Sequence, residues 1–159
     1  MLHYRIEELP AFSVIGLEQE LTNQKSQNLK RCLAFWPQFN QQLKLNRLNQ
    51  ANQNWTKFAF MERRENQLTY FCAIPCSNEI PANFILKEIP ASSYLVVEHL
   101  GSIDRIYSTY EELYQKLIPS LDVSLAQTAF LHFEKYDQRF YWKRADSVIE
   151  IWVPIRIEK

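Results

Sequence analysis

The feature that most constrains this chain is an internal repeat at an offset of 80 residues. Residues 4–11 (YRIEELPA) match residues 84–91 (FILKEIPA), and the similarity continues to Glu18 and Glu98. Such a period is long enough for one supersecondary unit with several elements, and two copies bury what one copy cannot. We therefore expect two copies of one unit, at about residues 1–78 and 82–157, within a single domain that spans residues 1–159.

Each half shows the same predicted order of elements. An apolar stretch follows each Pro-Ala pair, at 14–17 and 94–97, and indicates a strand entered through a proline turn. Apolar residues then recur at helical spacing, and two further strands are predicted in each half. Pro37 falls inside the first helical pattern and is expected to kink or split it. The predicted helices cover residues 29–43 and 106–117, and the predicted strand pairs cover 57–62 with 68–74 and 129–136 with 148–153.

This order predicts an α+β fold made of two tandem, pseudo-symmetric strand-helix-strand-strand modules with antiparallel sheets. A sheet covered by a helix on one face must also bury its other face, and the sister half is the natural partner. The cleft between the halves is the expected ligand site. Residues 46–54 indicate a polar connection, and residues 137–146 indicate an exposed loop with an aromatic centre that could fold over something.

Charge and composition exclude several function classes. Eighteen basic residues balance eighteen acidic ones without a local basic cluster, so direct binding to nucleic acid is not expected. With only two glycines, the chain lacks phosphate-cradling loops and dinucleotide fingerprints, and we expect no cofactor. Short apolar runs and the absence of a signal-peptide pattern predict a cytoplasmic protein that does not cross a membrane. The cysteines, Cys32, Cys72 and Cys76, lack zinc-site spacing and are expected to be reduced thiols in a core.

Glu134 is the strongest candidate for binding chemistry. Strand alternation places it on one face with Phe130, His132 and Tyr136, and directs Leu131 and Phe133 towards the helix-packed core. On the last strand, residues 149, 151 and 153 form an aliphatic face and leave Glu150 and Trp152 opposite. The pattern thus predicts that the Glu134 carboxylate and the Trp152 ring look into the same space.

Simpler explanations compete with this one. Glu134 could lie solvated at a strand end, or pair with Lys135, Arg139 or Arg144. The three histidines, His3, His99 and His132, are scattered without the spacing of metal ligands, and no local motif marks a nucleophile and its base. The aromatics at helical spacing, among them Trp36 and Tyr107, suit either core packing or a pocket edge.

Together these segments resemble the GyrI-like small-molecule-binding domain, also described as the bacterial transcription activator effector-binding domain. The resemblance covers essentially the whole chain. It rests on IPASSYLVVEHLG at 89–101, the tyrosine-rich helical segment through Leu117, FEKYD at 133–137 and the ending VIEIWVPI at 148–155.

The resemblance implies two strand-helix-strand-strand modules with a ligand cleft between them. It also implies that Glu134 is the central acidic residue of that cleft, that stacked aromatics hold lipophilic cations, and that Trp152 is one of them. We expect a small, cationic and aromatic ligand. The predicted ligand-binding set is Glu134, Trp152, His132, Tyr94, Phe60, Trp36 and Tyr107.

The chain departs from many members in one respect, because no helix-turn-helix segment precedes the first repeat. We expect a binding module that senses or sequesters its ligand, as a homodimer or in association with a separate DNA-binding protein. Two alternatives remain open: a GyrI-like hydrolase in which the pocket glutamate activates water against electrophilic compounds, and a protein-interaction role resembling that of gyrase-inhibitor members.

Overall fold

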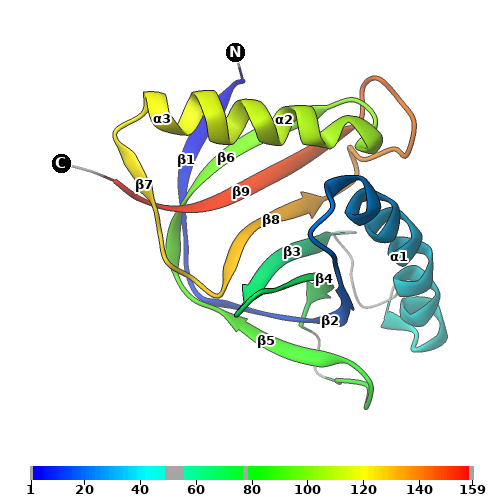
Figure 1. The fold of residues 1–159 in the computed structure, drawn as a ribbon. Coiled ribbons are helices and arrows are strands. Elements are labelled where there is room, and N and C mark those ends of the chain that lie inside the picture. Colours follow the sequence, from blue (N-terminus) through cyan, green and yellow to red (C-terminus); the bar gives the residue numbers. More distant parts are fainter. Residues whose placement is uncertain (1, 49–55, 77–78, 158–159) are drawn as a thin grey trace.

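The structure is a computed structural model that describes residues 2–48, 56–76 and 79–157 (Figure 1). It has the predicted mixed α+β architecture, in which two similar halves follow each other along the chain. The first half contains β1 (Tyr4–Leu9), β2 (Phe12–Glu20), α1 (Lys25–Leu45), β3 (Lys57–Arg64) and β4 (Gln67–Pro75). The second half contains β5 (Ile85–Ile89), β6 (Ser92–Leu100), η2 (Ile103–Arg105), α2 (Ile106–Glu112), η3 (Leu113–Leu117), α3 (Ile118–Ser120), β7 (Val123–Leu125), β8 (Phe130–Tyr136) and β9 (Val148–Ile157).

Within the described ranges, the strands form a nine-stranded antiparallel sheet whose main path is β1-β6-β9-β8-β3-β4-β2-β5, with β7 on β9. The path has the same pattern from either end, because β1, β6, β9 and β8 take the places of β5, β2, β4 and β3. The pseudo-symmetry axis therefore passes between β8 and β3. These two strands bring Glu134 opposite Ala59, at the centre of the sheet.

Each half begins with a strand that the sequence analysis did not predict, and that strand pairs with the other half; the second half also contains the short unpredicted strand β7 on β9. β1 pairs with β6, and β5 pairs with β2. The crossings occur at Pro10-Ala11 and Pro90-Ala91, between β1 and β2 and between β5 and β6. Proline has no amide donor for a ladder, so it suits a bend where a strand leaves one half-sheet for another. The most similar segment of the two repeats thus marks the exchange between them.

The expectation that Pro37 splits the first helix is wrong, because α1 runs as one helix from Lys25 to Leu45. Proline removes one helical hydrogen bond, a loss of about 3 kcal/mol in an unsupported helix. Here Pro37 is exposed while its neighbours Trp36, Phe39 and Leu43 are buried against the sheet. Burial of each such side chain contributes about 1.5 to 3 kcal/mol, which is enough to keep the helix continuous.

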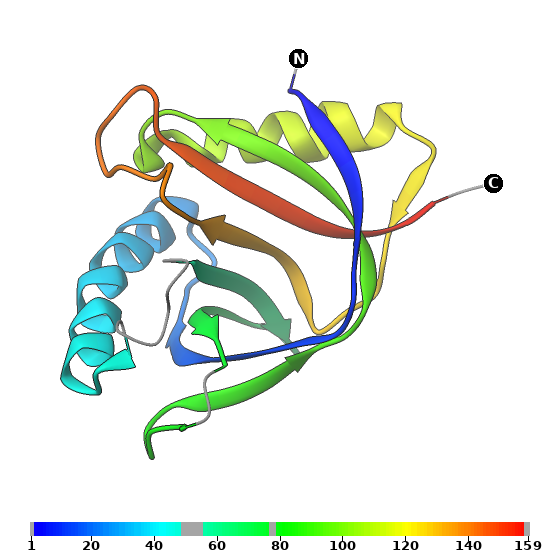
Figure 2. The same ribbon diagram turned by 180° about the vertical axis from the view of Figure 1, so that it is seen from behind.

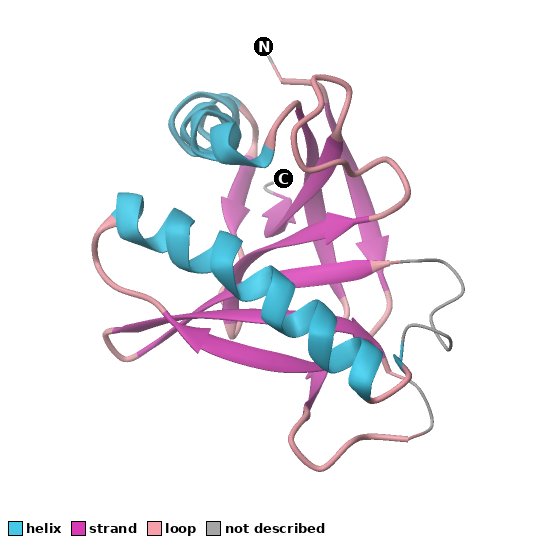
Figure 3. Ribbon diagram, turned by 90° about the vertical axis from the view of Figure 1, so that its right-hand side faces the viewer, coloured by secondary structure: helices cyan, strands magenta, loops and turns pink. Residues whose placement is uncertain are grey.

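The two faces of the sheet have different covers. Both α1 and α2 lie over one face, where their apolar residues join Leu95, Val97, Ile149, Ile151 and Val153 in one core. Figure 3 shows α1 crossing this face. The other face has no helix in its core, and the sheet instead curls on itself as a half-barrel (Figure 2).

The core inside this curl is built largely from aromatic side chains of the strands. Its buried members include Phe58, Phe60, Phe71, Tyr94, Phe130, Phe133 and Trp152.

The structure also shows where the predicted connecting segments and the three cysteines lie. Residues 49–54 of the predicted polar connection lie outside the described residues. In the loop before β9, the Phe140 ring packs edge-on against Tyr136 at 4.9 Å between centroids, so the loop is anchored at its centre. Cys32 and Cys72 are buried free thiols, whereas Cys76 is exposed and not in the core. No helix in the part of the chain that the structure describes is both long and apolar enough to cross a membrane.

Candidate ligand-binding site

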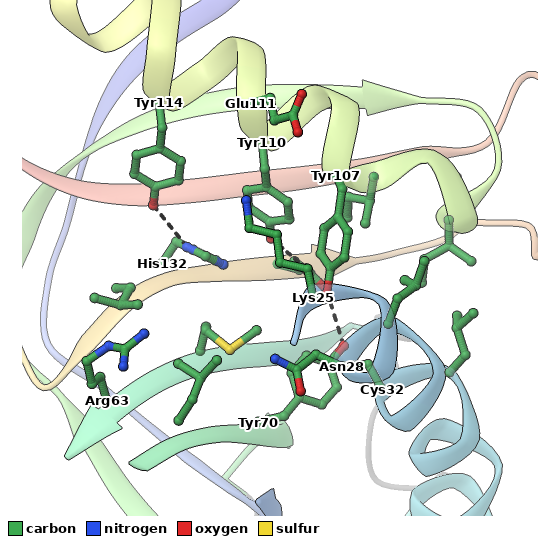
Figure 4. Close-up of a pocket in the computed structure, with 18 of the residues that line it drawn as sticks. Lys25, Asn28, Cys32, Arg63, Tyr70, Tyr107, Tyr110, Glu111, Tyr114 and His132 are labelled. Atoms are coloured by element: carbon green, nitrogen blue, oxygen red, sulfur yellow. Dashed lines mark hydrogen bonds between the residues drawn. The ribbon is translucent and has the colours of Figure 1, made fainter. Parts of the chain in front are cut away.

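A cavity of about 260 Å³ lies between α1 and α2, over strands β3, β4 and β8 (Figure 4). Each half of the chain supplies one helix, so the cavity occupies the predicted position between the two modules. Its walls are mostly apolar and aromatic, with Leu29, Met61, Leu68, Ile106 and Tyr107 among them. An apolar pocket with a few polar groups is the usual form of a small-molecule site.

Glu134 lines this cavity and is only 5% exposed. Three tyrosine hydroxyls donate hydrogen bonds to its carboxylate. Tyr110 reaches Oε2 at 2.5 Å, while Tyr136 and Tyr70 reach Oε1 at 2.5 and 3.3 Å. These tyrosines come from α2, β8 and β4, so the carboxylate connects elements of both halves.

The Glu134 carboxylate forms no ion pair with a described residue. Burial raises the pKa of its carboxyl, and the hydroxyl donors from Tyr110, Tyr136 and Tyr70 oppose that rise without cancelling it. Over residues 2–48, 56–76 and 79–157, no lysine, arginine or histidine forms an ion pair with it. A buried carboxylate in this state favours either a proton or an added cation.

The three basic residues considered as partners for Glu134 lie elsewhere. Arg139 pairs with Asp137, Glu98 and Glu150. Arg144 pairs with Asp146, and the Lys135 ammonium lies 5.9 Å from the centre of the Trp152 ring. The solvated or salt-bridged alternative for Glu134 is therefore wrong.

Trp36 lies behind the cavity rather than in its wall. Its indole Nε1 donates to the Tyr70 hydroxyl at 3.0 Å, and Tyr70 in turn donates to Glu134. The Trp36 ring also packs edge-on against Tyr136, with 4.9 Å between ring centroids. From α1, Trp36 thus positions two of the three donors of the carboxylate, and it lines a separate cavity of about 220 Å³ under Phe140.

His132 lines the cavity two residues before Glu134. The Tyr114 hydroxyl lies 2.9 Å from its Nδ1, and the Tyr110 ring lies 4.5 Å from its ring. Nε2 is buried without a hydrogen-bond partner among the described residues. Burial lowers the pKa of His132 to about 3, so the imidazole is neutral at physiological pH and does not repel a cation.

The tyrosines of the second helix reach this site through their helical spacing. Figure 4 shows Tyr107, Tyr110 and Tyr114 projecting from that helix towards the sheet. Burial raises the pKa of the Tyr107 hydroxyl to about 12, so it stays a neutral hydroxyl in the cavity wall. Tyr114 belongs to a π-helical turn, 113–117, a distortion frequently found at functional sites.

Trp152, Tyr94 and Phe60, by contrast, lie on the opposite face of the sheet, in the aromatic core of the curl. The β8–β9 register shows why, since Phe133 lies opposite Trp152 while Glu134 lies opposite Ile151. The prediction that Glu134 and Trp152 look into the same space is therefore wrong. Alternation along β9 correctly puts Trp152 on the face opposite Ile151. The error was to assign Glu134 of β8 to the face of Trp152 and not to the face of Ile151.

Two further expectations for β8 are wrong as well. Phe133 does not face the helix-packed core but stacks on Trp152, with 5.5 Å between ring centroids and 11° between planes. Phe130 does not share the face of His132, because the β3–β8 pairing shifts register at Leu131. This β-bulge leaves both Leu131 and His132 in the cavity wall.

The predicted ligand-binding set leaves out Tyr70, Tyr110 and Tyr114, and Tyr136 was placed on the face of Glu134 without a role in its hydrogen bonding. Two signals were available. Tyr107, Tyr110 and Tyr114 recur at helical spacing, and Tyr136 follows Glu134 by two strand residues. Tyr70 carries no such local signal, because its approach depends on the pairing of β3 with β4 and β8.

A family described as "Cass2: Integron-associated effector binding protein" matches residues 5–155. The transcriptional regulator BrlR of Pseudomonas aeruginosa is 23% identical over 158 residues, which are 97% of this chain and 56% of that protein. The chain therefore spans only about half the length of this relative.

Solved structures show the same fold. The structure of SAV2435 bound to tetraphenylphosphonium superposes with a TM-score of 0.78 at 18% identity, covering 97% of this chain and 94% of that one. The EcmrR C-terminal domain superposes with a TM-score of 0.68 at 19% identity, covering 99% of each chain.

Proposed function

This chain belongs to the Cass2 family of integron-associated effector binding proteins, and on that premise we propose that it binds lipophilic organic cations in the cavity over Glu134. It acts as a sensor or sequestering module and not as an enzyme. The ligand is a small aromatic cation, and Glu134 is its counter-charge. Tyr107 and the rings of Tyr110 and Tyr114 supply the stacking surface.

The observation that carries this proposal is the buried Glu134 carboxylate, which has three neutral donors and no cationic partner among the described residues. A ligand cation would supply the missing charge in a cavity of reduced dielectric constant, where the attraction exceeds its value in water. Each well-placed aromatic face adds about 0.5 to 2 kcal/mol of cation–π attraction. The lowered pKa of His132 leaves the neighbouring imidazole neutral, so it does not compete with the ligand for the carboxylate.

The relatives support this assignment. SAV2435, which has the same fold, was solved with tetraphenylphosphonium, a lipophilic cation. BrlR is a transcriptional regulator, and EcmrR has been solved bound to DNA as a longer chain, of which the matched region covers 58%. By analogy, the present chain supplies the ligand-sensing part of such a system, as a homodimer or beside a separate DNA-binding protein.

Calorimetry with a matched cation and neutral compound tests the assignment. Tetraphenylphosphonium should bind with micromolar affinity, and Glu134→Gln should weaken it by about ten- to a hundredfold, the scale of a charge-assisted contact. Triphenylphosphine oxide, which is neutral, should lose far less. Glu112→Gln is the control, because Glu112 lies on α2 outside the cavity wall.

A hydrolase is the alternative function that one observation favours. The raised pKa of Glu134 also suits a general base that activates water against an electrophilic compound. Equal losses for the cation and the neutral compound in Glu134→Gln would show that the carboxylate does not select charge, and would favour this alternative.

A further inference from the structure

We propose that the ligand carries an anionic group in addition to its cationic group, and that Arg63 holds the anionic group at the mouth of the cavity, where the charge of Lys25 adds to the positive potential. This inference rests on the proposed function, because it assumes that Glu134 receives the cationic end. It specifies the ligand class as amphoteric aromatic compounds, with opposite charges at the two ends of an apolar body.

The first observation is that Arg63 lines the cavity without an ion pair to a described carboxylate. It is exposed and lines the cavity, on the same face of β3 as Met61. No carboxylate in the part of the chain that is described pairs with it. The next residue, Arg64, points to the opposite face and is paired with Glu18 and Glu62. Two adjacent arginines therefore differ in role, since one is neutralised by the fold and the other presents its charge to the cavity.

The second observation concerns Lys25, which lines the cavity from α1. It is the first residue of α1, it is exposed, and it lines the cavity without an ion pair to any described carboxylate. The first turn of α1 contains no acidic residue, so the positive end of the helix dipole adds to the lysine charge. Figure 4 shows the Lys25 side chain extended across the space below α2.

Glu111 lies on the other side of the opening. It projects from α2, across the cavity from Arg63 on β3 (Figure 4). An anionic group placed at the β3 side therefore meets Arg63 and avoids Glu111, whereas Lys25 reaches towards α2. The opening is asymmetric in charge, which gives a bound ligand one preferred orientation.

The spacing of the strand residues fixes how far apart the two ligand charges must lie. Glu134 is opposite Ala59, and Arg63 is four residues further along β3 on the same face. At roughly 3.4 Å per residue this corresponds to about 14 Å between backbone positions, and the long arginine side chain shortens it. The intervening wall is apolar, formed by Met61, Leu68 and Leu131. An aromatic body with a cation at one end and a carboxylate at the other suits this arrangement.

Rhodamine B and rhodamine B ethyl ester form a matched pair of probes, because the first has a free carboxylate at pH 7.5 and the second is a pure cation. We expect Arg63→Gln to weaken rhodamine B by about three- to fivefold, the size of a solvent-screened ion pair. The ester should change by less than about twofold. Lys25→Gln should act in the same direction, and 0.3 M salt should reduce both effects.

Arg64→Gln is the matched control, since it removes an equal charge one residue away on the opposite face. It should leave both dyes unchanged. Equal losses for both dyes in Arg63→Gln, or no loss for either, would overturn the inference. If the ester binds and requires Glu134 while Arg63→Gln does not discriminate, only this inference fails. If neither dye binds the wild-type protein, the proposed function fails with it.

Discussion

Glu134 and Glu150 are both 5% exposed, but they lie on opposite faces of the sheet and their pKa values shift in opposite directions. On the curled face, the Glu150 carboxylate accepts hydrogen bonds from Arg139, Arg5 and the indole of Trp152, and its pKa is lowered because these partners outweigh its burial. On the helix-covered face, Glu134 has only hydroxyl donors, and burial raises its pKa. Burial alone therefore does not determine the charge of a carboxylate, whereas the charge of its partners does.

The repeat makes this difference more informative. Glu62 is the counterpart of Glu134 in the matching segments 58–62 and 130–134, and it too is buried. It lies on the other face, however, where Lys87 and Arg64 neutralise it. The two carboxylates that align in sequence therefore differ in structure: Glu62 is paired on the curled face, whereas Glu134 has no ion pair among the described residues on the helix-covered face.

The largest change in folding stability is expected for Trp152, which lies on the curled face of the sheet and away from the cavity. Trp152→Ala should lower the free energy of unfolding by about 3 to 5 kcal/mol, because it removes a buried ring that stacks on Phe133 inside the curl. Urea denaturation measures the loss. Trp152→Phe keeps a ring there and should bind tetraphenylphosphonium within about twofold of the wild-type affinity, since nothing in the cavity is changed. A large loss of affinity in Trp152→Phe would contradict the division between the faces.

The next prediction compares Glu150→Gln with Glu134→Gln by their stability across pH. The pKa of Glu150 is lowered, so its ionised form stabilises the fold above its ordinary value of 4.5, and this contribution is lost as the pH falls through the lowered pKa. Glu150→Gln should therefore cost about 1 to 2 kcal/mol at pH 7, a loss limited by the partial exposure of both arginines. The difference from wild type should fade in acid.

Glu134→Gln should show the opposite trend. Its raised pKa means that the protonated form stabilises the fold, fully below 4.5, and that this contribution is lost as the pH rises through the raised pKa. The variant should therefore gain roughly 1 kcal/mol over wild type at neutral pH, because the amide is never charged. Parallel pH profiles for the two variants would show that the carboxylates do not differ as described.

The smallest predicted effect concerns one donor of the carboxylate. Tyr110→Phe keeps the ring but removes a hydroxyl that opposes the rise in the pKa of Glu134. The pKa should rise further, so cation binding should move to higher pH, with a loss of about 1 kcal/mol in weakly acidic buffer that shrinks at alkaline pH. Titrations with rhodamine B ethyl ester between pH 5 and about 9 measure this shift in the pH dependence of binding. Tyr107→Phe is the control, and an equal shift in that variant would contradict the role of Tyr110.

The repeat allowed much of the fold to be predicted from sequence, because segments with matching elements must form matching units. It predicted the α+β class, both helices, six of the strands (β2, β3, β4, β6, β8 and β9) and a cleft between the halves. It did not predict that β1 and β5 would be exchanged, since pairing between distant strands leaves no local pattern. Packing of Trp36 and Phe39 kept α1 continuous through Pro37, which local propensity alone did not anticipate.

The site was predictable only where one element determined it. Glu134, His132 and Tyr107 were named from a strand and a helix, and they do lie in one cavity. Trp152 was assigned by matching two strands whose register the sequence does not contain. The β8–β9 pairing places it on the opposite face. The sequence gives no sign that Arg63 and Lys25 lie at the mouth of the cavity, because exposed basic residues are common and only the fold brings both into its wall.

The most direct test of the account is the pKa of Glu134 itself, measured by carbon-13 NMR of its carboxyl carbon with and without tetraphenylphosphonium. We expect the pKa of Glu134 to lie above the ordinary 4.5 in the free protein, since burial dominates. It should be lower when the cation is bound, because the added charge stabilises the carboxylate. Glu150, observed in the same spectra, should have a pKa below 4.5 in both states. A Glu134 pKa that the bound cation leaves unchanged would contradict the central claim that this carboxylate is the counter-charge of the ligand.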